Sequence, residues 1–107
     1  MEENYRLIYK ILKTLERAMD IEDFDFQSIQ AKALGISDQR WAHIIEMLID
    51  EGYIKGVSLT RDAAGNTFTS NEYPRITLKG LEYLSENAIM KRMYNAAKGL
   101  VDLIPLP

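Results

Sequence analysis

The segment from Ser37 to Gly52 constrains the fold more than any other part of the sequence, because it carries both the ends and the periodicity of one helix. Ser37 is a residue type that caps helix N-termini, and Gly52 stands where a glycine commonly ends a helix. Ile36 and Trp41 have the spacing of a hydrophobic staple around that cap. Between the two ends, apolar residues recur at intervals of three and four, which predicts one buried face. Its members are Trp41, Ile44, Ile45, Leu48 and Ile49.

The part of the chain before Ser37 predicts two more helices joined by an acidic connection. Helical spacing of apolar residues predicts an amphipathic helix over about residues 4–19. A short helix is expected over about residues 26–34, closed by Gly35. In the connection, Phe24 and Phe26 are expected to anchor the chain in the core. The face of the first helix expected to be buried comprises Leu7, Ile8, Ile11, Leu12, Leu15 and Met19, and the opposite stripe of Arg6, Lys10, Lys13 and Arg17 is interpreted as a solvated helix back.

A change in residue type after Gly52 predicts a β-hairpin. Residues 53–60 are rich in aromatic and β-branched side chains, which favours a strand, although Gly56 weakens it. Residues 61–66 resemble a turn, and a second strand should end near residues 75–77.

Two helices are predicted after the hairpin. Thr77 can cap a fourth helix that should end near Asn87, and Gly80 at its start is interpreted as a close-packing position. Apolar residues at intervals of three and four over residues 89–101 predict a last helix, and Pro105 and Pro107 follow it. This helix must be covered by the domain itself or by a second copy of the chain.

The order of these elements predicts a mainly α (α+β) fold of the winged helix-turn-helix class. Three helices, a β-hairpin wing and C-terminal helices follow one another, with residues 35–37 as the turn between the second and third helices. We expect residues 1–87 to form the winged-helix domain. Residues 88–107 are expected to form a helical extension that packs on the domain or makes a dimer contact.

Composition excludes several classes of protein. A chain of 107 residues is expected to form one hydrophobic core. The absence of cysteine excludes disulfides, a thiolate zinc site and a cysteine nucleophile, and fits a reducing compartment. No apolar run is long enough to cross a bilayer, and the acidic amino terminus does not resemble a signal peptide. With a net charge of −3, nucleic acid is not the electrostatic default partner.

Three segments make the chain similar to one family. They are Asn4-Tyr5-Arg6-Leu7-Ile8-Tyr9-Lys10-Ile11-Leu12, Glu51-Gly52-Tyr53-Ile54-Lys55-Gly56-Val57 and Leu78-Lys79-Gly80-Leu81-Glu82-Tyr83-Leu84. On these residues the chain resembles the YjcQ-like family, which comprises small winged-helix proteins of Gram-positive bacteria and their phages. The resemblance implies a fold and a genomic setting, and it implies no biochemical activity.

Two kinds of partner remain open from the sequence. If the domain binds duplex DNA, the third helix enters the major groove and the hairpin approaches the backbone or minor groove. The candidate DNA-binding residues are Gln39, Arg40, His43, Arg61, Asn66, Arg75 and Lys79. The alternative is a protein partner or a homodimer, with the last helix as the contact. The candidate interface residues are Met90, Met93, Tyr94, Leu100 and Val101.

Catalysis is not expected, because His43 is the only histidine and no nucleophile elbow, phosphate loop or dinucleotide fingerprint accompanies it. We expect no metal site, no cofactor and no membrane association. The sequence therefore predicts a small cytoplasmic, non-enzymatic accessory or regulatory module of phage or prophage type.

Overall fold

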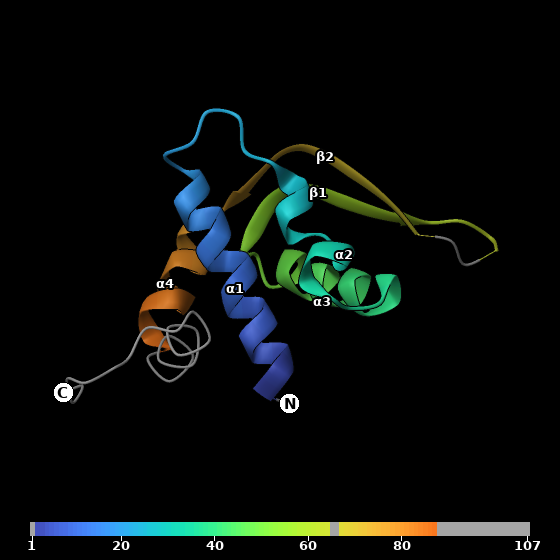
Figure 1. The fold of residues 1–107 in the computed structure, drawn as a ribbon, viewed down its shortest axis with the longest axis horizontal. Helices are drawn as coiled ribbons and strands as arrows, with labels where there is room; N and C mark the ends of the chain where they lie inside the picture. Colours follow the sequence, from blue (N-terminus) through green and yellow to red (C-terminus); the bar gives the residue numbers. More distant parts are fainter. Residues whose placement is uncertain (1, 65–66, 88–107) are drawn as a thin grey trace.

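A computed structural model describes residues 2–64 and 67–87 and shows four helical segments, a hairpin and a further helix (Figure 1). The elements are α1 (Glu2–Ala18), the 3₁₀ helix η1 (Phe26–Ile29), α2 (Ala31–Leu34), α3 (Asp38–Asp50), β1 (Ile54–Arg61), β2 (Thr67–Ile76) and α4 (Leu78–Glu86). The strands form a two-stranded antiparallel sheet. The predicted fold class is confirmed: the structure mixes α and β, is mostly helical, and is consistent with a winged helix.

Helix α1 is the central element, because α3 and α4 both pack against it and β2 crosses it (Figure 1). Leu7, Ile11, Leu12 and Leu15 are buried as expected, and Ile8 is partly buried. The prediction for Met19 was wrong: its side chain is 63% exposed, because the helix ends at Ala18 and the helical period no longer applies. Contacts on two sides widen the buried face, and Tyr9 is therefore also buried.

The prediction of a single helix over residues 26–34 was also wrong, because Gln30 interrupts the helix. This residue has extended backbone angles and separates η1 from α2. The carbonyl oxygen of Ile29 accepts a hydrogen bond of 2.7 Å from Nε1 of the buried Trp41, so a side chain occupies an acceptor that a continuous helix would use. Asp25 caps η1 by accepting a hydrogen bond from the backbone N–H of Gln27 at 3.0 Å.

Helix α3 has the predicted boundaries and the predicted buried face. The hydroxyl of Ser37 accepts a hydrogen bond of 3.1 Å from the backbone N–H of Arg40. Gly35 closes α2 with a left-handed φ of 72°, so α3 starts after a tight turn. The buried residues are Trp41, Ala42, Ile44, Ile45 and Leu48, with Ile49 partly buried.

The hairpin extends past α2 and α3 (Figure 1). Its pairing runs from Ile54 opposite Ile76 to Arg61 opposite Thr67, with an irregularity between Lys55 and Val57. Gly56 occupies this bulge with φ of 81°, and a Cβ there would lie only 2.0 Å from the carbonyl oxygen of Tyr73. Only glycine fits both the backbone angle and the close approach of β2.

Helix α4 is tied to the start of the hairpin. The hydroxyl of Thr77 accepts from the backbone N–H of Gly80 at 3.1 Å and donates to the carbonyl oxygen of Gly52. Gly80 is buried directly against the carbonyl group of Tyr53, which confirms the close-packing interpretation. Tyr83 packs on Tyr53 with ring centroids 5.2 Å apart. Within the described part of the chain, every helix is too short or too polar to span a membrane.

Two predictions lie outside the described residues. They are the last helix over residues 89–101 and the assignment of residues 88–107 as an extension. The division of the chain at residues 87 and 88 therefore stays a prediction.

Candidate functional site

The start of α3 is where the predicted DNA contacts would begin, and its arginine is turned back onto α1. Nε and Nη2 of Arg40 both donate to Oδ1 of Asn4, the first at 3.1 Å. Nη1 of Arg40 also lies 3.9 Å from Oε1 of Glu3. The guanidinium group is therefore engaged by an amide oxygen and a carboxylate of the same chain.

The rest of the exposed face of α3 is polar to acidic. Gln39 and His43 are exposed, as predicted, and Met47 is exposed next to them along the helix. Asp38 and Asp50 are exposed at the two ends of the helix. Gln39 and His43 could meet a partner directly, but Arg40, the one lysine or arginine within α3, is engaged by Asn4 and Glu3.

Arg61, at the end of β1, forms an ion pair that joins the hairpin to α3. Its Nη1 lies 2.9 Å from Oε2 of Glu46. The contact links the hairpin to α3, and both side chains are partly exposed. The second arginine of the predicted DNA site is therefore also paired with a carboxylate.

Arg75 lies at the opposite end of the hairpin from Arg61, and Lys79 follows in the first turn of α4. Nη1 of Arg75 donates to the carbonyl oxygen of Tyr73 at 3.1 Å, and its guanidinium carbon lies 5.2 Å from the centre of the Tyr73 ring. Nζ of Lys79 lies 5.7 Å from the centre of the Tyr53 ring. Arg75 is opposite Lys55 in the strand register, so these cations share the base of the hairpin. The predicted DNA-binding residues thus fall into two separate groups.

Six predicted site residues lie outside the part of the chain whose side chains the structure describes. They are Asn66 of the DNA-binding set and Met90, Met93, Tyr94, Leu100 and Val101 of the partner interface.

Among the titratable groups of the described residues, the phenol of Tyr83 is perturbed. Burial raises its pKa above the ordinary value of 10.0, and the neighbouring phenols of Tyr53 and Tyr5 raise it further. This group packs between α4 and the start of the hairpin, so it belongs to the core contacts of α4. No group of three or more His, Asp or Glu residues within residues 2–64 and 67–87 could hold a metal ion.

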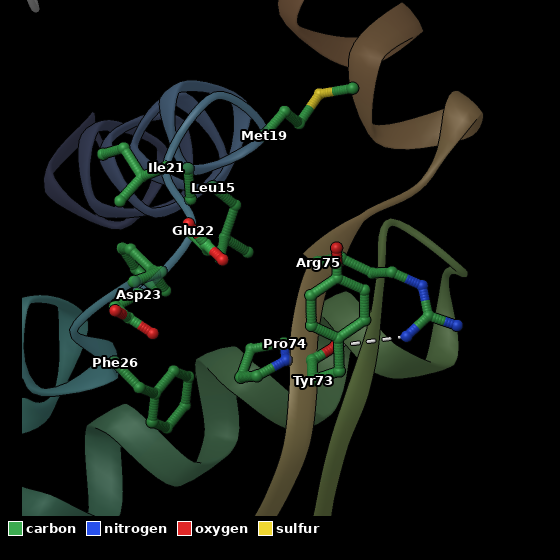
Figure 2. Close-up of a pocket in the computed structure, with 11 residues that line it drawn as sticks. Leu15, Met19, Ile21, Glu22, Asp23, Phe26, Tyr73, Pro74 and Arg75 are labelled. Carbon is green, nitrogen blue, oxygen red and sulfur yellow. Dashed lines mark hydrogen bonds between the residues drawn. The ribbon is translucent and has the colours of Figure 1, made fainter.

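A groove that sequence reasoning missed lies between the end of α1, the loop that follows it and β2 (Figure 2). It has a volume of about 270 Å³. Leu15, Phe24, Phe26 and Pro74 line it, and Met19, Ile21 and Tyr73 stand exposed around it. The sequence offered one signal, the two phenylalanines within an acidic run, and it predicted only core anchoring for them.

Comparison with known proteins identifies a family. The family described as YjcQ protein matches residues 9–103, which is nearly the whole chain. Neither a curated protein nor a solved structure matches the chain. The predicted family resemblance is confirmed, and this chain belongs to the YjcQ family.

Proposed function

We propose that this chain is a non-enzymatic protein-interaction module built on a winged-helix scaffold, and that α3 does not bind duplex DNA. One observation carries the proposal. Both arginines available to the α3 face are engaged within the chain, Arg40 by Asn4 and Glu3 and Arg61 by Glu46. A protein gains most of its affinity for DNA from cations that neutralise phosphates, and these two would first have to leave their partners.

The charge around α3 supports the same conclusion. Asp38, Asp50 and Glu51 are exposed on or beside the helix, and the whole chain carries a net charge of −3. An acidic surface repels a polyanion and lowers the rate of encounter with it. The same surface is compatible with a protein partner, whose complementary charges set specificity and rate of association.

The absence of catalysis remains part of this proposal. His43 is exposed on α3, and within the described residues it makes no hydrogen bond to a carboxylate or hydroxyl that would orient it as a base. A location in the cytoplasm is also proposed, because a chain without cysteine suits a reducing compartment. We also propose that the protein belongs to a Gram-positive bacterium or one of its phages, as the family resemblance implies.

DNA binding at the base of the hairpin is the second candidate, and a specific observation favours it. Lys55, Arg75 and Lys79 form no ion pair with any carboxylate whose side chain the structure describes. These cations could contact phosphates without α3 entering a groove. Such contacts would bring affinity without sequence specificity.

Retention of the full chain on immobilised duplex DNA separates these alternatives. At about 0.15 M salt, where surface charges are screened beyond about 8 Å, we expect the wild-type chain to pass unretained. The test variant carries Arg40→Ala with Arg61→Ala. A matched control carries Arg6→Ala with Lys10→Ala, two exposed cations on the back of α1 that change the net charge equally.

Each retention pattern decides between the candidates. Salt-sensitive retention that the Arg40 and Arg61 variant loses and the control keeps would overturn the proposal. Retention lost only when Lys55 and Lys79 become alanine would establish the second candidate instead. Passage of every variant at that salt supports the proposal.

A further inference from the structure

We propose that the groove between α1, the loop of residues 19–25 and β2 binds a segment of a partner protein that carries a large apolar side chain next to a lysine or arginine. The inference rests on the proposed function, because it names the surface and the partner chemistry of a protein-interaction module. It uses neither α3 nor the residues after Asn87.

The apolar part of the argument is the gathering of exposed hydrophobic side chains at this one place. Tyr73 is 68% exposed, Met19 63% and Ile21 53%, and all three stand around the groove (Figure 2). Isolated exposed hydrophobics are ordinary, whereas a contiguous patch around a hollow marks a binding surface. Tyr73 adds an aromatic ring, the residue type that most often dominates binding energy at interfaces.

The shape of the groove suits a side chain rather than a flat contact. Leu15, Phe24, Phe26 and Pro74 line it, and its volume is about 270 Å³. Met19, with a flexible thioether chain, can adjust to the shape of the side chain that enters. An inserted apolar side chain would therefore contact these apolar residues, while Glu22, Asp23 and Arg75 complete the lining.

Charge selects the partner of that apolar side chain. Glu22 and Asp23 are exposed on the α1 side of the groove, and neither forms an ion pair with a cation that the structure describes. Arg75 lies on the β2 side, but its guanidinium group turns away from the two carboxylates toward the carbonyl oxygen of Tyr73 (Figure 2). The charge presented at the groove is therefore negative, and its complement is a lysine or arginine beside the apolar anchor.

Two other occupants fit the groove less well. An added β-strand would meet Pro74, which has no N–H to donate to a new ladder. A symmetric second copy would place the same patch on both sides of the contact and oppose two acidic loops containing Glu22 and Asp23. A heterologous partner with a basic and apolar segment avoids both difficulties.

The experiment selects binders from a display library of random peptides on the immobilised full chain. We expect the enriched peptides to share a leucine, phenylalanine or tryptophan adjacent to lysine or arginine. Synthetic peptides of the enriched sequences are then titrated against wild type and variants by calorimetry. Tyr73→Ser should weaken binding by about tenfold or more, as expected for the loss of a hot-spot residue. Combining Glu22→Gln with Asp23→Asn should weaken it several-fold and reduce its dependence on salt.

Matched controls separate the groove from the rest of the surface. Tyr5→Ser removes a tyrosine that is 48% exposed on α1 and does not line the groove. Asp38→Asn with Glu51→Gln removes two exposed carboxylates near α3. Both controls should bind the selected peptides as wild type does.

The outcomes distinguish this inference from the proposed function. If the peptides bind the Tyr73→Ser variant and the double variant of Glu22 and Asp23 as they bind wild type, the groove is not the binding site. A protein-interaction role would then lie elsewhere on the chain. No enrichment, or enrichment of acidic peptides, would also overturn the proposal that the groove binds a basic and apolar segment. If the chain self-associates with rising concentration and Tyr73→Ser abolishes this, the occupant of the groove is a second copy of the chain, and the proposed partner is overturned. DNA retention through α3 would overturn the proposed function without bearing on the groove.

Discussion

Replacing Gly80 with alanine sets two physical effects against each other. Gly80 lies in the first turn of α4, and alanine is the better helix former by about 1 kcal/mol. An alanine Cβ, however, would lie 2.5 Å from the carbonyl oxygen of Tyr53 and 2.6 Å from Cγ1 of Ile76. Ordinary contacts of a Cβ lie between 3.4 and 4 Å, so the neighbours would have to move by about 1 Å.

The backbone of Tyr53 has little freedom to make that movement. Its carbonyl oxygen also accepts the backbone N–H of Thr77 at 3.0 Å, so a shift would weaken the junction between β2 and α4. Overpacking of this kind costs about 1–3 kcal/mol, and we expect a destabilised variant even after the helix propensity gain. Because the obstructing atom is a backbone carbonyl oxygen, we expect a cost in the upper part of this range, about 2–3 kcal/mol. Subtracting the helix propensity gain of about 1 kcal/mol leaves a net loss in the free energy of unfolding of about 1–2 kcal/mol.

Urea unfolding followed by far-UV circular dichroism measures this loss, and Gly35→Ala is the control. Gly35 has a left-handed φ of 72° with nothing within 4 Å of an added Cβ, so its substitution reports backbone strain alone, about 1–2 kcal/mol. A Gly80→Ala chain as stable as wild type, or more stable, would show that helix propensity outweighs the contact with Tyr53 and would refute the reasoning.

Two further predictions concern buried side chains. Trp41→Phe removes the donor to the carbonyl oxygen of Ile29 and should cost about 1–3 kcal/mol in urea unfolding, because that acceptor is left buried and unpaired; a loss below about 0.5 kcal/mol would contradict the role of this bond. The raised pKa of Tyr83 means that the folded chain holds this proton more tightly than the unfolded chain. The resulting stability is complete below the ordinary tyrosine pKa of 10.0 and is lost as pH rises through the raised value. Tyr83→Phe should therefore lose less stability than wild type over that range, and equal losses would contradict it.

The helices and the hairpin could be predicted from the sequence where local signals agreed. At α3 the Ser37 cap, the apolar period and Gly52 all indicate the same boundaries, and the structure has them. At α4 the Thr77 cap and the close packing of Gly80 were predicted in the same way. Local rules succeeded where the determining contacts are within a few residues.

The failures involve contacts between distant parts of the chain. The interruption of the helix at Gln30 accompanies the hydrogen bond from Trp41 to the carbonyl oxygen of Ile29. The apolar periodicity of residues 26–34 does not reveal this contact. The burial of Tyr9 depends on α1 being covered on two sides. Each requires knowledge of which element packs against which.

For the candidate site, the sequence predicted which residues are exposed on α3, but not which residues contact one another. Gln39 and His43 are exposed as expected, whereas the engagement of Arg40 by Asn4 joins residues far apart in the sequence. The groove is likewise assembled from the end of α1 and from β2. Sequence patterns identify amphipathic faces, but they do not reveal which exposed residues of different elements meet.

The position of Trp41 gives the molecule its own optical reporter. The indole packs edge to face against Phe26 with ring centroids 6.3 Å apart, and Phe26 in turn lines the groove between α1 and β2. Because this is the single tryptophan of the chain, its intrinsic emission arises from one environment. A side chain that enters the groove and displaces the Phe26 ring will change that emission without any attached label.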